Sequence, residues 1–145
     1  MEILDPSAAE QIARAAIAFQ LQATGHEPTS VTVILSGDTL LITLREALSP
    51  AEKAVAGSPE GAAQVQEFHR QLFLTAAHKL RQEIKRITGV EVRETTTEVD
   101  AAAGGVVHAF SNGTMVQVFL LSGGVHASSW SGSGADDLPQ NQLSV

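Results

Sequence analysis

The chain has neither cysteine nor tyrosine among its 145 residues. The lack of cysteine excludes disulfides, thiolate zinc sites and cysteine nucleophiles. The common catalytic and nucleotide-binding motifs are missing as well, because the sequence contains no P-loop, no G-x-G-x-x-G, no H-E-x-x-H and no G-x-S-x-G. These absences favour a protein without catalytic activity, so we expect no catalytic residue, no metal site and no cofactor.

Signals for membrane insertion are also absent. The first residues, MEILDPSAAE, have neither the basic segment nor the apolar core of a secretory signal. No apolar run approaches the length that is needed to span a bilayer. We therefore expect a cytoplasmic protein without direct membrane insertion, which would serve a membrane system only by docking to it as a peripheral component.

Basic residues are scarce, with 9 Lys and Arg against 16 Asp and Glu and a net charge of -7. A nucleic-acid backbone would be repelled by such a charge unless a basic stripe opposed it. The one candidate stripe, from Lys79 to Arg86, is interrupted by Glu83, so we expect no nucleic-acid binding. With 43% apolar and 17% charged residues, the composition is typical of one globular domain with a sizeable core.

Two Ser-Pro steps in the middle of the chain mark the starts of two helices. Residues 49–52, Ser-Pro-Ala-Glu, form a capping box with proline at the first helical position, and Gly57 ends this short helix. Ser58-Pro59 repeats the start signal for a longer helix that we expect to run to about Thr88, before Gly89. An N-terminal helix is predicted to begin near Ser7 and to end at Gly25.

Apolar residues at helical spacing predict which sides of the two long helices face the core. In the N-terminal helix they are Ile12, Ala15, Ala16, Phe19 and Ala23. In the long helix they are Val65, Phe68, Leu72, Phe73, Ala76, Leu80, Ile84 and Ile87. Ile17 and Leu21 lie on a different side of the first helix, which predicts a second covered face.

The remaining segments predict strands. Residues 31–44 read as a β-hairpin around Gly37-Asp38, a candidate type II′ turn, with Val31, Val33 and Leu35 on the same apolar face as Leu40, Ile42 and Leu44. Residues 105–123 predict a second hairpin that turns at Asn112-Gly113. Residues 90–99 are β-branched and charged, and predict one further strand. The fold class is therefore α+β: an antiparallel sheet of two hairpins plus a strand, packed by an N-terminal helix and a long central helix, with a short helix between.

In the second hairpin, pairing residue 110 with residue 115 sets the two faces. One face carries Val107, Ala109, Val116 and Val118. The other carries Val106, Phe110, Met115 and Phe119, around His108 lying opposite Gln117. His108 and Gln117 are candidate ligand residues, although a polar pair that interrupts an apolar interface is the favoured interpretation.

His69 is the most informative titratable residue, because it lies near the middle of the apolar stripe of the long helix. A base or metal ligand facing a cavity is one interpretation. A half-buried histidine with a single structural hydrogen bond is the other, and we favour it.

The apolar surface exceeds what a domain of this size can cover. Both faces of the second hairpin are apolar, and helices in so small a domain cover only one face of a sheet. The surplus predicts a homo-oligomer, with a dimer as the first expectation, unless the C-terminal segment GVHASSW covers it. The candidate interface residues are Ile17, Leu21, Val106, Phe110, Met115 and Phe119.

Taken in order, the segments GHEPTSV, VTVILSGDTLLITL, REALSPAEKAVAGSPEG and VQEFHRQLFLTAAHKLRQEIKRITGVEV resemble a known family. Over about residues 8–110 the chain is similar to the small bacterial MpsC-like proteins, named as sodium-translocating, membrane-potential-generating proteins and otherwise largely of unknown function. The most specific part is the stretch from Leu48 to Lys53. The resemblance implies an α+β domain with an accessory role beside a membrane ion or inorganic-carbon transport system, and it implies no catalytic residues.

The leading prediction is thus a non-enzymatic, homo-oligomeric accessory protein that possesses one domain over residues 1–127 and a flexible polar tail over 128–145. The alternative is a small-ligand or metal-binding sensor or enzyme with a pocket near His69 or His108. A pocket with convergent polar groups near either histidine would favour the alternative.

Overall fold

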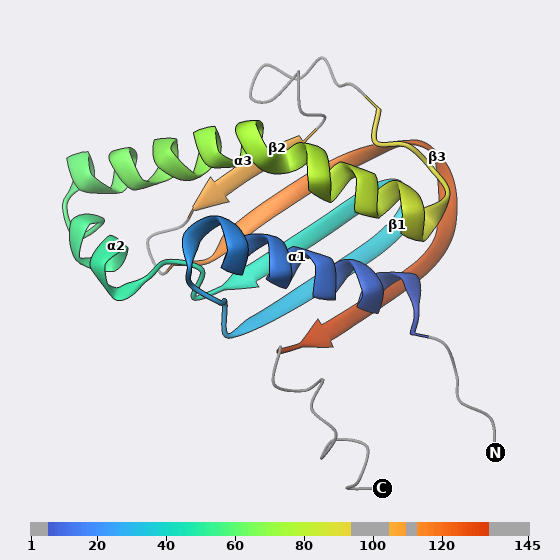
Figure 1. Ribbon diagram of the computed structural model, residues 1–145, viewed down its shortest axis with the longest axis horizontal. Coiled ribbons are helices and arrows are strands. Elements are labelled where there is room, and N and C mark those ends of the chain that lie inside the picture. The colour runs from blue at the N-terminus through green and yellow to red at the C-terminus, as the bar shows by residue number, and fades with distance from the viewer. Residues whose placement is uncertain (1–5, 94–104, 110–112, 134–145) are drawn as a thin grey trace, which may run out of the picture.

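The computed structural model describes residues 6–93, 105–109 and 113–133 of the chain. Its elements follow one another as α1 (Ala8–Thr24), β1 (Ser30–Arg45), α2 (Pro50–Val55), α3 (Pro59–Thr88), β2 (Gly105–Ala109) and β3 (Met115–Gly132). The strands form one antiparallel sheet in the order β1-β3-β2, and α1 and α3 lie side by side on the same face of it (Figure 1). The predicted α+β class is confirmed.

The first predicted hairpin forms within β1, which turns back on itself at its midpoint (Figure 1). Gly37 has a φ of 59°, whereas Asp38 keeps a negative φ, the combination found in a type II′ turn. The two ends of β1 meet, since the Thr29 N–H donates to the Arg45 carbonyl at 3.0 Å. The six residues predicted to share the apolar face are all buried: Val31, Val33, Leu35, Leu40, Ile42 and Leu44.

The strand β3 follows both arms of this bent strand. Its first part pairs Met115–Leu120 with Thr39–Leu44, and its last part pairs Ser128–Gly132 with Val31–Leu35. Between them the register shifts at Gly37, so β3 curves around the turn of β1 (Figure 1). The expected arrangement of two separate hairpins plus a strand is therefore only partly met, because one long strand pairs with both β1 and β2.

This path corrects the predicted domain boundary. Residues 128–132 belong to the sheet instead of a flexible tail, and Ser128 Oγ accepts a hydrogen bond from the Ala9 N–H at 3.2 Å. The Ser/Gly-rich composition predicted a flexible tail. Pairing in a sheet uses backbone N–H and C=O groups, which serine and glycine carry like any other residue except proline. Residues 134–145 of the predicted tail lie outside the described residues.

The register of the second hairpin differs by one residue from the prediction. His108 pairs with Val116, and Gln117 pairs with Val107. The predicted pairing of His108 with Gln117 is therefore wrong. The long pairing of β3 with β1 sets which face of β3 meets the helices, and a shift of one residue exchanges the two faces. The turn signal at Asn112-Gly113 was too local to decide this.

The predicted helix ends are confirmed by their caps. The Ser7 and Ser58 side chains accept hydrogen bonds from backbone N–H groups in the first turns of α1 and α3, and Gly25 and Gly89 end these helices with a φ of 77° each. A complete capping box at Ser49 begins α2. The two Ser-Pro steps therefore begin α2 and α3, and a short turn connects these two helices.

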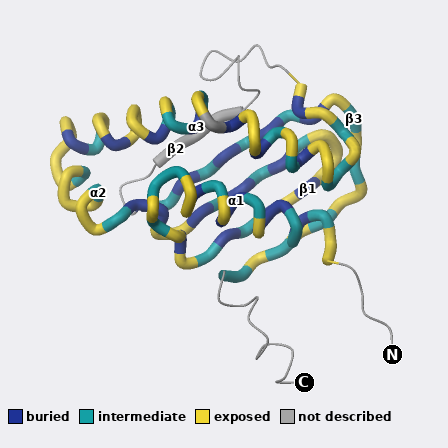
Figure 2. The backbone as a smooth tube through the Cα atoms, viewed as in Figure 1, coloured by how far each residue is buried: buried dark blue, intermediate teal, exposed yellow. Residues whose placement is uncertain are grey.

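The core lies between the helices and the sheet, and Figure 2 shows the buried stretches of α1 and α3 on their inner sides. Two expectations about the helices are wrong. Ile17 is buried in the core instead of forming an outer edge, and Phe68 is 53% exposed instead of buried. In each case the side that meets the sheet is rotated from the predicted stripe, which apolar spacing alone could not distinguish because both sides carry apolar residues.

The strand expected over residues 90–99 is described only at its start. Val92 forms a bridge with Leu121, and the Arg93 N–H donates to the Leu120 carbonyl at 2.9 Å. Residues 91–93 therefore run beside β3, next to the edge where β2 pairs. Residues 94–99 lie outside the described residues.

Candidate functional site

His69 occupies the inner side of α3 and is only 3% exposed. Its Nε2 lies 2.7 Å from Glu52 Oε2, on α2. Because an ionised carboxylate only accepts hydrogen bonds, the proton of this contact belongs to Nε2, which donates it. The neighbouring Phe68 ring meets the imidazole edge to face, with 5.3 Å between ring centroids. The structure agrees with a histidine that makes a structural hydrogen bond, although the side chain is buried and not half-buried as expected.

Glu52 connects the start of α2 to α3 through its two oxygens. Oε1 accepts a hydrogen bond from the Ser49 N–H at 2.9 Å, while Oε2 accepts the one from His69. Burial raises the pKa of the Glu52 carboxyl, but the Ser49 backbone hydrogen bond and the hydrogen bond and charge of His69 outweigh it and lower the pKa below the usual 4.5. The carboxylate stays ionised, and it accepts the hydrogen bonds of the Ser49 N–H and of His69 Nε2.

Sequence reasoning missed Glu52 as the partner of His69. The capping box identified Glu52 as a residue of α2, but such a box occupies only one of its two carboxylate oxygens. A histidine on the inner side of a helix also requires a hydrogen-bond partner. The sequence shows both that Glu52 has a free carboxylate oxygen and that His69 requires a partner. That the two residues meet depends on how α2 folds back onto α3, which the sequence does not show.

The second candidate pair is not brought together. Gln117 is buried on the helix-covered side of β3, and its Oε1 has no hydrogen-bond partner among the described residues. His108 pairs through its backbone with Val116, and its side chain is outside the described part of the structure. The described residues contain no group of three or more His, Asp or Glu side chains that could hold a metal ion.

The candidate interface residues are divided between core and surface. Met115, Phe119 and Ile17 are buried within the chain, so they offer no surface to a partner. Leu21 is 45% exposed on α1. Phe110 and the side chain of Val106 are outside the described residues. The face of β3 that was expected to be spare is thus the face that the helices cover.

The spare face is the opposite one, which we call the open sheet face. It carries the side chains that alternate with the buried ones along β1 and β3: Thr32, Ile34, Thr39, Leu41, Thr43, Val116, Val118 and Leu120. None of these eight residues is charged, although the exposed Arg45 lies beside them and donates a hydrogen bond to Thr32 Oγ1 at 2.9 Å. No helix in the described parts of the chain lies over this side of the sheet (Figure 1). Ile34, 42% exposed, is the most accessible apolar side chain among them.

A second apolar surface lies where α2 meets α3. Phe68 and Val55, which is 48% exposed, line a shallow hollow of about 370 Å³ together with Ala51, Val65 and the stem of Glu52. No residue of α2 is buried, as Figure 2 shows, so this small helix is held mainly by its caps and by the contact of Glu52 with His69.

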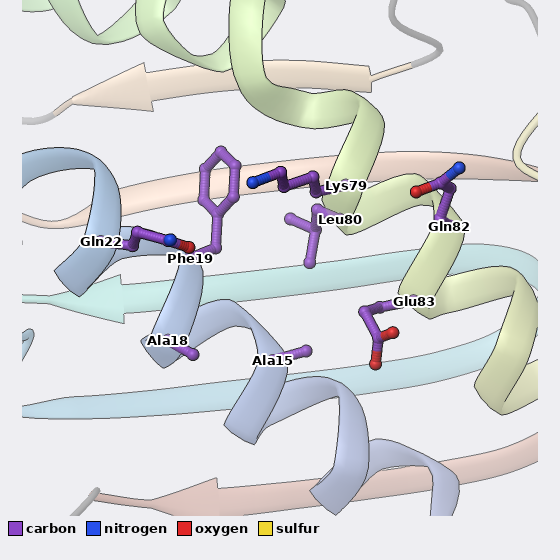
Figure 3. Close-up of a pocket in the computed structure, with 8 residues that line it drawn as sticks. All are labelled: Ala15, Ala18, Phe19, Gln22, Lys79, Leu80, Gln82 and Glu83. Atoms are coloured by element: carbon purple, nitrogen blue, oxygen red, sulfur yellow. The ribbon is translucent and has the colours of Figure 1, made fainter.

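A groove runs between α1 and α3 on the outer surface of the helical layer. It consists of two hollows of about 460 and 430 Å³ that share Phe19, Gln22 and Lys79. Figure 3 shows the first hollow, in which Phe19 and Lys79 point toward one another from the two helices and Leu80 lies between Lys79 and Glu83. No sequence signal pointed to this groove, because it arises from the spacing of two helices that are distant in the chain.

Comparisons with known proteins agree with the resemblance found in the sequence. A family model described as Na+-translocating membrane potential-generating system (MpsC) matches residues 6–113. The uncharacterized protein YbcI of Bacillus subtilis (strain 168) is 26% identical to this chain over 100 residues, which cover 69% of this chain and 81% of the relative. No solved structure matches the chain. Among the helices in the described residues, none has the length and apolar character needed to cross a membrane.

Proposed function

This chain belongs to the MpsC family, and we propose that it is a soluble, cytoplasmic, non-enzymatic accessory protein that works by binding other polypeptides, beginning with a second copy of itself. The open sheet face carries this proposal. It presents Ile34, Leu41, Val116, Val118 and Leu120 on the side of the described sheet that lies away from α1 and α3 (Figure 1). Exposed apolar faces of this kind are typical of protein interfaces.

The charge of the chain favours a second copy as the occupant. Each copy carries a net charge of -7, so two copies repel one another over most of their surfaces. The open sheet face carries one charged side chain, Arg45 at the end of β1, which donates a hydrogen bond to Thr32 Oγ1 at 2.9 Å. Thr32, Thr39 and Thr43 surround the aliphatic centre of the face, which holds no charge. Two such faces related by a twofold axis would pack as a β-sandwich, with aliphatic side chains of both sheets between them.

Weakening the open sheet face is therefore expected to dissociate a dimer. We choose the double variant Ile34→Thr, Val118→Thr, because threonine keeps the β-branched shape that suits a strand. Full burial of an Ile or Val side chain contributes about 1.5–3 kcal/mol, and about 1.4 kcal/mol is a tenfold change in affinity. We expect the dimer dissociation constant to rise on the order of 100-fold, measured by sedimentation equilibrium.

The matched control is Leu21→Thr, which replaces a side chain of similar exposure on α1, in the other layer of the fold. It is expected to leave the dissociation constant unchanged. A monomeric wild-type protein at all concentrations, or a dimer that responds to the α1 variant and not to the sheet variant, would reject this interface.

The family description extends the proposal to a membrane system. The matching family is described as a Na+-translocating membrane potential-generating system, and a domain with no spanning helix among its described residues fits the role of a peripheral subunit. We assign docking on the membrane-embedded subunit to the hollow around Phe68 and Val55, because exposed aromatic side chains beside a hollow are typical interface anchors.

A tagged chain is accordingly expected to co-purify with a membrane-spanning transport subunit from detergent-solubilised native cells. Phe68→Ser should reduce the recovery of that subunit at least tenfold, since removal of an interface anchor commonly costs about 2 kcal/mol or more and about 1.4 kcal/mol is a factor of ten. Leu21→Thr, which removes a comparably exposed apolar side chain, serves as the control. Recovery of the tagged chain alone, identified by mass spectrometry, would contradict the transport link and leave the dimer proposal intact.

The alternative of a ligand or metal site at His69 has less support. The imidazole is buried and its Nε2 is already bound to Glu52, so it is not presented to a ligand. His108 pairs with Val116, and Gln117 faces the core.

A further inference from the structure

The groove between α1 and α3 combines an apolar floor with a polar rim. Phe19 lies at its centre, Ala15, Ala18 and Leu80 line one half, and Ala23 and Leu72 line the other. The lining residues of α3 extend from Leu72 to Glu83, which at 1.5 Å per residue corresponds to a length of about 16 Å. Each hollow has the volume of a small-molecule site.

Lys79 is the cationic residue that both hollows share. Glu83 lies four positions further along α3, where it would normally pair with a lysine. Glu83 instead accepts hydrogen bonds from Arg86, the closest at 2.8 Å, and this interaction lowers the pKa of the Glu83 carboxyl. In the described part of the chain, Lys79 has neither a hydrogen bond nor an ion pair. An unpaired ammonium group therefore stands above apolar side chains in a chain that is otherwise strongly acidic.

The two halves of the groove differ in charge. Glu83 lines the half that contains Ala15 and Ala18, as Figure 3 shows. The half around Ala23 and Leu72 contains no carboxylate, and its polar lining consists of Gln22, Thr75, His78 and Lys79. An apolar chain laid against Glu83 would remove its ionised carboxylate from water, which is unfavourable. An anionic molecule bound at Lys79 would therefore direct its apolar part toward Leu72.

We propose that this groove binds a free amphipathic monocarboxylate, with its carboxylate on Lys79 and its apolar chain along Phe19, Ala23 and Leu72. The Lys79 ammonium supplies the charge-assisted hydrogen bond. Gln22, which both hollows share, supplies an amide donor beside it. The floor of the groove removes the chain from water.

Decanoate, below its micelle concentration, is the probe that tests the site in the full chain. We expect saturable binding by isothermal titration calorimetry, with amide shifts in NMR spectra confined to residues 19–23 and 72–79. Lys79→Gln should weaken binding at least tenfold. Lys53→Gln, which removes a lysine of α2 outside the groove, should leave it unchanged. Decyltrimethylammonium, with the same chain and the opposite charge, should not compete.

A pair of alanine variants on α1 tests the direction of the chain. Ala23→Phe fills the half of the groove next to Leu72 and should abolish binding, whereas Ala18→Phe fills the other half and should preserve it. The reverse result, or equal binding by wild type and Lys79→Gln, overturns the proposal. Absence of decanoate binding overturns it too, and Lys79-dependent binding to phosphatidylglycerol vesicles without decanoate binding would assign the groove to a membrane surface instead.

This site is independent of the proposed dimer, because the groove and the open sheet face lie on opposite sides of the molecule (Figure 1). The Ile34→Thr, Val118→Thr variant should bind decanoate with wild-type affinity. Failure of one proposal therefore leaves the other to be judged on its own measurement.

Discussion

Replacement of Gly61 by alanine is expected to destabilise the fold by about 3 kcal/mol, at the upper end of what overpacking usually costs. Gly61 lies in the first turn of α3, where a glycine-to-alanine change would ordinarily stabilise the helix by about 0.5–1 kcal/mol. Here a Cβ would overlap with the carbonyl oxygen of Val55, the last residue of α2. Both atoms belong to rigid parts of the structure, so α2 has to move.

The movement of α2 would also separate Glu52 from His69, which makes this effect larger than a local clash. The free energy of unfolding is measured by urea denaturation at neutral pH. Gly57→Ala is the matched control, because its Cβ would meet the Ala54 carbonyl oxygen at 3.3 Å, a contact that a small shift relieves. Its effect should be below about 1 kcal/mol. A Gly61→Ala protein as stable as wild type would show that α2 is not held against α3 at this point.

The second large effect is expected from His69→Ala, at about 3 kcal/mol of lost stability. The change removes a buried ring, which leaves a cavity, and it also removes the hydrogen bond to Glu52. His78→Ala on the exposed side of the same helix should change stability by less than about 0.5 kcal/mol, as surface substitutions usually do. His69→Gln, which retains an N–H donor, should recover part of the loss.

The pH dependence distinguishes the hydrogen bond from simple loss of volume. Because the pKa of Glu52 is lowered in the folded protein, its contribution to stability is present above the unfolded value of 4.5 and is lost as the pH falls through the lower folded value. Without His69, the folded pKa moves closer to the unfolded one. The His69→Ala penalty should therefore be larger at pH 6 than at pH 3, and a constant penalty would mean that packing alone matters.

Local signals in the sequence predicted the helix ends and the first turn correctly. Ser49 and Ser58 cap helices, Gly25 and Gly89 end them, and Gly37 turns β1, because each of these roles depends on a few neighbouring residues. The inner side of α3 was harder to predict. Phe68 and His69 are neighbours, so only one of them can lie at the centre of the inner side of α3, and hydrophobicity predicts Phe68 there.

The structure places His69 inside because Glu52 provides a partner from another helix. Such non-local information is absent from the spacing of residues in α3. The same limit explains the one-residue error at His108, since the pairing of β3 with β1, between residues 71 to 101 positions apart in the sequence, outweighs the turn beside it. The open sheet face was partly visible as the alternation of Ile34 and Leu41 with threonines, and only the position of β3 shows which neighbouring side chains join it.

The path of β3 around β1 has a consequence for biosynthesis. The ribosome completes β1 long before it makes β3. One outer edge of the β1 hairpin lacks backbone partners until residues 115–120 are made, and the other lacks them until residues 128–132 are made. Domains usually begin to fold from the N-terminus while synthesis continues. In this protein the last strand synthesised in the described sheet pairs with both arms of the first, so that sheet is complete only after residue 132 has been made. The nascent chain, more than the finished protein, is therefore the form in which a chaperone would protect those edges.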